Sequence, residues 1–248
     1  MGCLDQKVAI VTGSGRGIGR ATAELFAAEG AKTVVLFRTP ENVERVVDGI
    51  RAAGGDALGV VCDIADPDQI TAAVDKVVEE YERIDILVNN AFDPSAVLSP
   101  VVDLSVEQLQ RNFEMGPIAY LRMMQACYPH LKASGEGRVI NFGSTAGVVA
   151  IEGYAPYGMA KEAVRALTRS AAREWAKDKI TVNNLLPVAD TWGAADSDVP
   201  PPANALGRYG SPEKDVAPVV LFLASRDAQY LTGYSLTPDG GFMIDAAR

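Results

Sequence analysis

Three side chains in the second half of the chain have the types and spacing to act together on one oxygen atom. Tyr157 and Lys161 are four residues apart, so a helix over residues 155–177 would place them one turn apart on one face. A nearby ammonium favours the phenolate and lowers the pKa of a phenol, which makes tyrosine a usable acid near neutral pH. Ser144 follows an apolar strand predicted over residues 138–142, at whose carboxyl end parallel sheets place ligands. The pattern predicts acid or base chemistry at a carbonyl oxygen.

A tyrosine four residues before a lysine is also common on helix surfaces that face solvent. The Tyr157–Lys161 pair therefore indicates an active site only if other parts of the chain form a ligand-binding site beside it. The start of the chain predicts such a ligand, because residues 7–12 are typical of a buried strand and are followed by a glycine-rich turn and a helix to about Glu29. Glycines let a backbone approach a pyrophosphate, and the helix start offers unpaired N–H groups to it. The turn residues expected to contact the ligand are Gly13, Gly15, Arg16, Gly17, Ile18 and Gly19.

The end of the second predicted strand, residues 33–37, indicates which dinucleotide binds. An acidic residue there would bind the free ribose of NAD(H), but the chain has Arg38 instead. Together with Arg16, Arg38 offers two guanidinium groups suited to a ribose 2′-phosphate. We therefore favour NADP(H) over NAD(H); the alternative is that either arginine only makes the surface soluble.

Strands and helices alternate along the rest of the chain. Further strands are predicted over residues 57–62, 84–88, 139–142 and 181–186, and further helices from residue 40, over 66–81 and over 105–131. This alternation is typical of a parallel sheet with helices on both faces. Residues 188–206 show no periodicity, and a loop of this length in a compact domain is usually functional, so we interpret it as a substrate lid.

Composition narrows the function classes. The chain has 248 residues, is 48% hydrophobic and carries a net charge of −9, which fits one α/β domain over residues 1–248 and disfavours nucleic-acid or anionic-membrane partners. Cys3, Cys62 and Cys127 suggest neither disulfides nor a zinc site, and a reducing cytoplasm fits best. With His130 as the one histidine, a Ser-His-Asp triad or a multi-histidine metal site is excluded, and no metal is expected.

At this point the sequence resembles one family, the short-chain dehydrogenases/reductases, over nearly its whole length. The matching residues are Thr12 to Gly19 for the TGxxxGIG loop, Asp63, Asn89-Asn90-Ala91 for most of NNAG, Ser144 with Tyr157 and Lys161, Val182-Asn183, Pro187, Thr232-Gly233 and Asp239-Gly240-Gly241. The resemblance implies a Rossmann-type, doubly wound parallel sheet of about seven strands in a single domain. It also implies hydride transfer between nicotinamide C4 and a carbonyl or alcohol carbon.

The resemblance further implies roles for single residues. Tyr157 would be the acid or base, Lys161 would lower its pKa and hold the nicotinamide ribose, and Ser144 would bind the substrate oxygen. Further cofactor contacts implied are Asp63, Ile64, Asn90, Pro187 and Thr191. A homotetramer is expected by family analogy.

Three positions depart from the family pattern near the nicotinamide end. The family's usual asparagine, which holds a water linking the lysine to solvent, aligns with Gly116, and Asn112 lies one turn earlier. Phe92 stands where NNAG has its last glycine, and Val188 follows Pro187 where the family favours glycine. We hypothesise a reshaped pocket in which the bulk of Phe92 partly fills the space left at Gly116.

The sequence thus predicts an NADP(H)-dependent carbonyl reductase or alcohol dehydrogenase for a small to medium apolar substrate. Candidate substrate contacts are Val149, Ile151, Tyr154 and Trp192, although core packing would explain each of them better. One alternative is a cofactor-binding protein with impaired turnover, motivated by Gly116. Another is a reductase of imines or activated alkenes, for which an altered proton relay would matter less. Substrate identity, physiological direction and pathway are left open.

Overall fold

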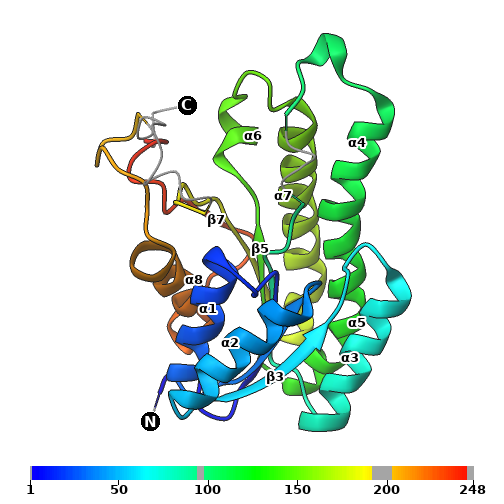
Figure 1. Cartoon of the computed structure of the whole chain (residues 1–248), viewed down its shortest axis with the longest axis vertical. Helices are drawn as coiled ribbons and strands as arrows, with labels where there is room; N and C mark the ends of the chain where they lie inside the picture. The colour runs from blue at the N-terminus through cyan, green and yellow to red at the C-terminus, as the bar shows by residue number, and fades with distance from the viewer. Residues whose placement is uncertain (1, 94–97, 192–202, 245–248) are drawn as a thin grey trace.

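The structure is a computed structural model that describes residues 2–93, 98–191 and 203–244. Its centre is a seven-stranded parallel sheet in the order β3-β2-β1-β4-β5-β6-β7, which confirms the predicted doubly wound α/β class (Figure 1). The strands are β1 (Val8–Thr12), β2 (Lys32–Phe37), β3 (Asp56–Val61), β4 (Ile86–Asn89), β5 (Arg138–Phe142), β6 (Thr181–Leu185) and β7 (Ser235–Leu236). The direction of strand progression reverses between β1 and β4, and open parallel sheets bind ligands at the carboxyl side of such a switch point.

Helices cover both faces of the sheet. The α-helices are α1 (Gly17–Ala28), α2 (Pro40–Ala52), α3 (Pro67–Tyr81), α4 (Val106–Phe113), α5 (Ala119–Ser134), α6 (Thr145–Val149), α7 (Ala155–Trp175) and α8 (Ala217–Ala224). The short turns between them are the π-helical η3 (Glu114–Ile118) and η6 (Pro212–Val216) and the 3-10 turns η2 (Val101–Asp103), η4 (Ala176–Asp178) and η7 (Arg226–Ala228). In Figure 1, α1, α2 and α8 lie on one side of the sheet, and α3, α5 and α7 lie on the other.

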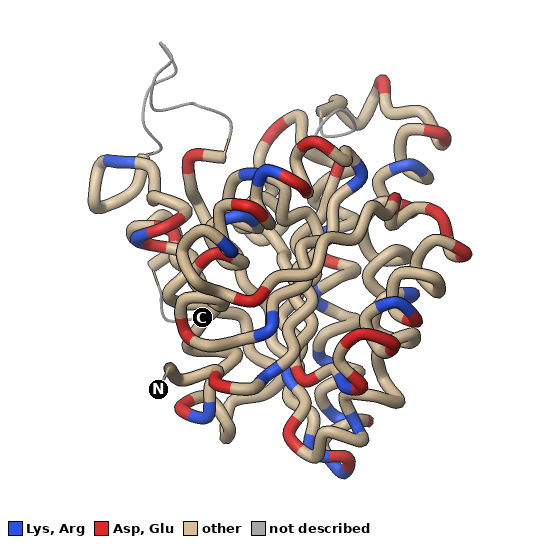
Figure 2. Tube along the Cα trace, turned by 60° about the horizontal axis from the view of Figure 1, so that its bottom comes forward, with Lys and Arg blue, Asp and Glu red and all other residues tan. Residues whose placement is uncertain are grey.

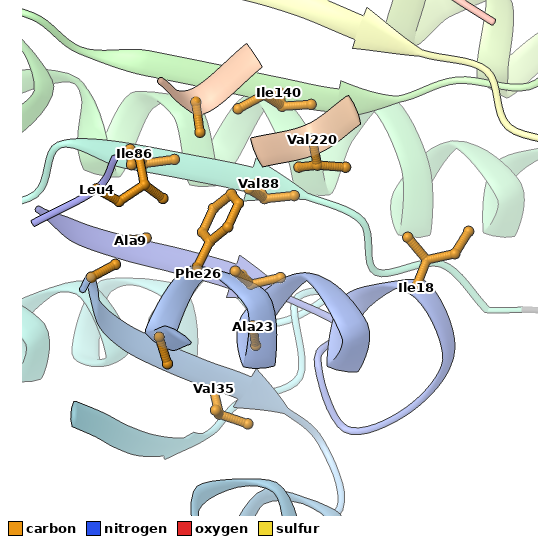
Figure 3. Packing of buried hydrophobic residues seen from close by; sticks show 14 of the residues in the cluster. Leu4, Ala9, Ile18, Ala23, Phe26, Val35, Ile86, Val88, Ile140 and Val220 are labelled. Carbon is orange, nitrogen blue, oxygen red and sulfur yellow. The ribbon is translucent and has the colours of Figure 1, made fainter. Parts of the chain in front are cut away.

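Each face of the sheet has its own apolar core, because successive side chains of a strand point to opposite faces. In β1, Ala9 and Val11 belong to the core under α1, α2 and α8, whereas Val8 and Ile10 belong to the core under α3, α5 and α7. Figure 3 shows Phe26 reaching from α1 toward the strands of the first core. Full burial of such a side chain stabilises a fold by about 1.5–3 kcal/mol, so both cores hold the strand ends rigidly in place.

The predicted continuous helix over residues 105–131 is wrong. It is interrupted by η3, where Gly116 has the non-helical angles φ −116° and ψ −106°. Pro117 supplies the physical reason, because a proline inside a helix has no N–H to donate and its ring crowds the preceding turn. Wider turns of this kind often occur at functional sites, and this one packs against α7, which carries Tyr157 and Lys161.

The other element predictions differ from the structure only at their ends. Helix α7 ends at Trp175 and continues as η4, which confirms the helix predicted over 155–177. The fourth strand covers Ile86–Asn89 rather than residues 84–88.

Charged residues of both signs are mixed along the described chain. Figure 2 shows red and blue segments interspersed over the helices rather than gathered by sign in this view. Within the described residues, no helix combines the length and apolar character needed to cross a bilayer. Those residues also contain no cluster of three or more His, Cys, Asp or Glu side chains that could hold a metal ion.

Candidate active site

A cavity of about 670 Å³ lies at the carboxyl ends of the strands, within the size range of small-molecule and cofactor sites. It brings together nearly every residue that the sequence singled out. Those lining it are Gly13, Arg16, Gly17, Ile18, Gly19, Arg38, Asp63, Ile64, Asn90, Ser144, Tyr157, Lys161, Pro187 and Thr191. Gly15 does not line it but supports the loop from behind, since a Cβ there would lie 2.6 Å from the Phe37 ring.

The glycine-rich turn is tied to the end of β4. The Thr12 hydroxyl accepts hydrogen bonds from the backbone N–H groups of Asn90 (3.0 Å) and Ala91 (3.1 Å), and the Asn90 amide donates to the Thr12 carbonyl (2.9 Å). Gly13 has φ +70°, and a Cβ on Gly19 would lie 2.4 Å from the Gly13 carbonyl oxygen. Only glycine fits both the conformation and this close approach.

The start of α1 faces the cavity with an unblocked positive end. Its first turn contains no acidic residue, and its N-cap residue Arg16 makes no side-chain capping hydrogen bond. Unpaired N–H groups and the helix dipole at such an end attract anions. Arg45, which the sequence reasoning missed, supports this turn by donating to the Gly15 carbonyl (2.6 Å).

The far end of the cavity is formed by the ends of β2 and β3. Arg38 follows β2 and is exposed, and Arg16 lines the same space. Asp63 follows β3, and its carboxylate accepts a hydrogen bond from the N–H of Ala65 (3.0 Å), which orients it at the cavity wall. Ile64 beside it is 3% exposed.

Ser144 and Tyr157 lie at the end of the cavity opposite Arg38 and Asp63. Ser144 is the N-cap of α6, where its hydroxyl oxygen accepts from the N–H of Ala146 (3.1 Å). The Tyr157 ring lies between the rings of Phe92 and Tyr154, with centroid distances of 5.1 Å and 6.1 Å. These edge-on contacts hold the phenol at the cavity wall.

Lys161 is 2% exposed and fully enclosed. Its ammonium donates to the Phe142 carbonyl (2.8 Å) and to the Tyr120 hydroxyl (3.5 Å). The rings of Phe92, Tyr120 and Tyr157 surround it, with the Phe92 centroid closest at 4.5 Å. Tyr120 is a further residue of the site that the sequence did not reveal, because a tyrosine inside an apolar helix pattern is indistinguishable from core.

The pKa of Tyr157 differs from the sequence-based expectation. We expected the lysine to lower it, but burial raises the pKa of the Tyr157 phenol, while its hydrogen bond with Ser144 opposes that rise. Burial lowers the pKa of the Lys161 ammonium to about 7. Desolvation disfavours the charged form of either group, so the neutral phenol is the stable form at neutral pH.

Two of the three departures from the family pattern, Phe92 and Gly116, meet at one point. A Cβ on Gly116 would lie 3.3 Å from Cε2 of Phe92, so the Phe92 ring occupies the space into which a side chain at position 116 would project. Asn112 is fully buried; its amide nitrogen donates to the Gln108 carbonyl of its own helix (2.9 Å), and it does not line the cavity.

The wall near Tyr157 is mainly apolar and aromatic. Of the substrate contacts predicted from sequence, Ile151 and Tyr154 line the cavity and Val149 does not, while Trp192 and most of the predicted lid over residues 188–206 lie outside the described residues. Wall residues missed by sequence reasoning include Asp93, Leu98, Met115, Tyr209 and Phe242.

Phe242 reaches the cavity through a turn that its neighbour Asp239 organises. The Asp239 carboxylate accepts from the N–H groups of Gly241 (2.8 Å), Phe242 (3.2 Å) and Met243 (2.9 Å). The Asp-Gly-Gly sequence, with both glycines at positive φ, was the signal for this turn.

Comparisons with known proteins agree with this geometry. A family model described as short chain dehydrogenase matches residues 7–193. The chain is 37% identical to the short-chain reductase protein NovJ of Streptomyces niveus, over 95% of this chain and 94% of that protein. It is 36% identical to the 12alpha-hydroxysteroid dehydrogenase of a Clostridium species (97% of this chain, 98% of that protein) and 35% identical to the cyclohexanol dehydrogenase of an Acinetobacter species (96% of each). With fold, cavity and relatives in agreement, the chain belongs to the short-chain dehydrogenase/reductase family and is an oxidoreductase of that family.

Proposed function

We propose that the protein is an NADP(H)-dependent reductase or dehydrogenase acting on the carbonyl or alcohol carbon of a small to medium apolar substrate. One observation carries this proposal: Ser144, Tyr157 and Lys161 lie together in a cavity whose other end is formed by the glycine-rich turn and Arg38. Acid chemistry and dinucleotide binding thus share one space.

The described residues fit a nicotinamide dinucleotide, because the open α1 terminus and the close-packed glycines suit a pyrophosphate. Arg16 and Arg38 would hold the ribose 2′-phosphate, Asp63 and Ile64 would border the adenine, and Lys161 would hold the nicotinamide ribose. When bound, the cofactor supplies or accepts the hydride. Asn90, Pro187 and Thr191 complete its proposed contacts.

The chain's own residues handle the proton. In reduction, Ser144 would donate a hydrogen bond to the substrate oxygen, and the Tyr157 hydroxyl would give its proton to that oxygen. Lys161 stabilises the phenolate that remains, since a nearby positive charge favours the charged form. The raised pKa of Tyr157 keeps the phenol protonated before the reaction.

An apolar substrate is supported by the wall around Tyr157. The cationic residues among the described lining are Arg16, Arg38 and Lys161, and the proposal assigns all three to the cofactor. Phe92, Leu98, Met115 and Ile151 face the remaining space. The names of two relatives, a hydroxysteroid dehydrogenase and a cyclohexanol dehydrogenase, point to the same substrate class.

Gly116 favours a second candidate. Glycine offers no side chain to hold a water, so the usual proton relay is changed. A reductase of imines or activated alkenes, or a cofactor-binding protein with little turnover, would tolerate that change.

The decisive experiment follows NADPH and NADH consumption by the purified chain with panels of ketones, aldehydes, imines and enones. We expect NADPH oxidation with apolar ketones or aldehydes. Turnover restricted to imines or enones would select the second candidate, and NADPH binding without any turnover would show a cofactor-binding protein.

Arg38→Ala tests the cofactor assignment. Loss of a charge-assisted contact to the 2′-phosphate is expected to raise the KM for NADPH about 10- to 100-fold and leave that for NADH nearly unchanged. Arg173→Ala, on the exposed end of α7, is the matched control. Equal effects on both cofactors would contradict the assignment.

We also propose a cytoplasmic homotetramer, supported by family resemblance and by the absence of cysteine pairing. Sedimentation at several protein concentrations would test the assembly.

A further inference from the structure

The enclosure of Lys161 is unusual for a charged group. Lys161 is 2% exposed and makes no ion pair with a carboxylate among the described residues. Its hydrogen-bond partners are the Phe142 carbonyl and the Tyr120 hydroxyl, both uncharged. A buried ammonium without a carboxylate needs another source of stabilisation, because desolvation disfavours its charge.

Two titratable side chains lie beside the Lys161 ammonium. Tyr157 faces it from α7 and Tyr120 from α5. In the segment after β4, Phe92 is followed by Asp93, which is 6% exposed and whose carboxylate pairs with Arg111 of α4 (2.7 Å). From β5, only the Phe142 carbonyl approaches the ammonium.

The Phe92 ring is the nearest aromatic face to this ammonium. Its centroid is 4.5 Å from the Lys161 nitrogen, against 5.3 Å for Tyr120 and 5.6 Å for Tyr157. The negative face of an aromatic ring attracts a cation, and the attraction grows where water is excluded. Phe92 therefore opposes the desolvation that lowers the pKa of Lys161.

Gly116 leaves room for this ring. A Cβ at position 116 would lie 3.3 Å from Cε2 of Phe92 and 3.6 Å from Cβ of Ala160, so a side chain there would press on the ring. The Asp93–Arg111 pair joins the segment after β4 to α4. Two departures from the family pattern thus form one contact.

We propose that Phe92 is a positioning residue for Lys161: its ring covers the ammonium from the side of Gly116 and helps to keep the charge in place there. Phe92 and Gly116 act as a coupled pair, and the ring takes the space that a polar side chain at position 116 would need. The role in turnover rests on the proposed function, in which the ammonium stabilises the Tyr157 phenolate. The contact itself does not depend on it.

The test uses the full chain and needs no turnover. Urea unfolding of wild type, Phe92→Leu and Phe92→Tyr is measured from neutral to alkaline pH, each with and without Lys161→Met. Because the folded-state pKa of Lys161 lies below its unfolded value, the lysine-dependent part of the stability rises with pH, starting near the folded pKa of about 7.

Leucine keeps apolar bulk but removes the ring. In Phe92→Leu the pH at which the lysine-dependent stability begins to rise should move about 0.4–1.5 units lower. Phe92→Tyr keeps a ring and should show the wild-type onset. An unchanged onset in Phe92→Leu would overturn the proposal.

The coupling is tested by Gly116→Ala in both backgrounds. The added Cβ should lower the stability of wild type and be tolerated in Phe92→Leu, where the ring is gone. Equal losses of stability in the wild-type and Phe92→Leu backgrounds would show that positions 92 and 116 are independent.

A second readout is the pH profile of kcat with NADPH and the best carbonyl substrate. Its alkaline limit should shift downward in Phe92→Leu and return in Phe92→Tyr. If the onset of the stability rise shifts but no variant turns over any substrate, the proposed function is wrong and the role of Phe92 is still supported. If the variants turn over but neither the onset of the stability rise nor the alkaline limit of kcat shifts in Phe92→Leu, the proposed function stands and the role of Phe92 is overturned.

Discussion

Tyr157→Phe is expected to reduce kcat for carbonyl reduction by about 10²- to 10⁴-fold, the range that a positioned acid contributes. The variant loses only the hydroxyl, since its ring keeps the edge contacts with Phe92 and Tyr154. Burial raises the pKa of Tyr157, so wild type holds the protonated phenol that reduction consumes. NADPH binding, followed by fluorescence, should be nearly unchanged, which separates lost chemistry from lost cofactor.

Tyr128→Phe is the matched control for this change. The Tyr128 hydroxyl donates to Asp178 (2.7 Å), and Tyr128 does not line the cavity. The kcat of Tyr128→Phe should equal that of wild type. A Tyr157→Phe variant that reduces ketones at the wild-type rate would remove Tyr157 from the mechanism and with it the carbonyl reductase proposal.

Lys161→Met is expected to lower kcat by about 10- to 10³-fold, because a cation close to a phenolate shifts its pKa by one to three units. Methionine keeps nearly the length of the side chain and removes a desolvated charge, so the fold should survive. The acceptor groups at the Phe142 carbonyl and the Tyr120 hydroxyl lose their donor. Near-UV circular dichroism would verify the fold, and Lys177→Met, at the exposed end of the same helix region, is the control.

The dependence of kcat on pH should also differ between wild type and Lys161→Met. Burial lowers the pKa of Lys161 to about 7, so the ammonium is present below that pH and is lost as pH rises through it. Wild-type kcat for reduction should therefore fall above about pH 7, while the low rate of Lys161→Met should not change there. The same alkaline fall in both would mean that another group titrates.

The doubly wound class was predictable because its signals are local. Hydrophobic runs of strand length, glycines at the first turn and helical spacing report what each segment does by itself. The four-residue spacing of Tyr157 and Lys161 placed both on one face of α7 before any tertiary contact was known. Ser144 and Arg38 were located by the strand that each follows, and parallel strands end at one edge of a sheet.

Other predictions failed where a contact distant in sequence decided the outcome. A helix was predicted over residues 105–131, yet the chain widens into a π turn at Pro117 and packs against α7. The lowered pKa expected for Tyr157 is instead a raised one, because burial disfavours the charged phenolate. Burial is a property of all the elements that surround a group, and one helix face does not reveal it.

The sequence by itself determined the strand and helix order, the anion-binding turn and the residues able to move a proton. Only the tertiary structure decided that Phe92 covers the Lys161 ammonium and that the Asp239 turn carries Phe242 to the cavity. The physical reason is the range of the interactions. Periodicity and turn chemistry act over a few neighbouring residues, whereas packing and desolvation join side chains that the chain order keeps far apart.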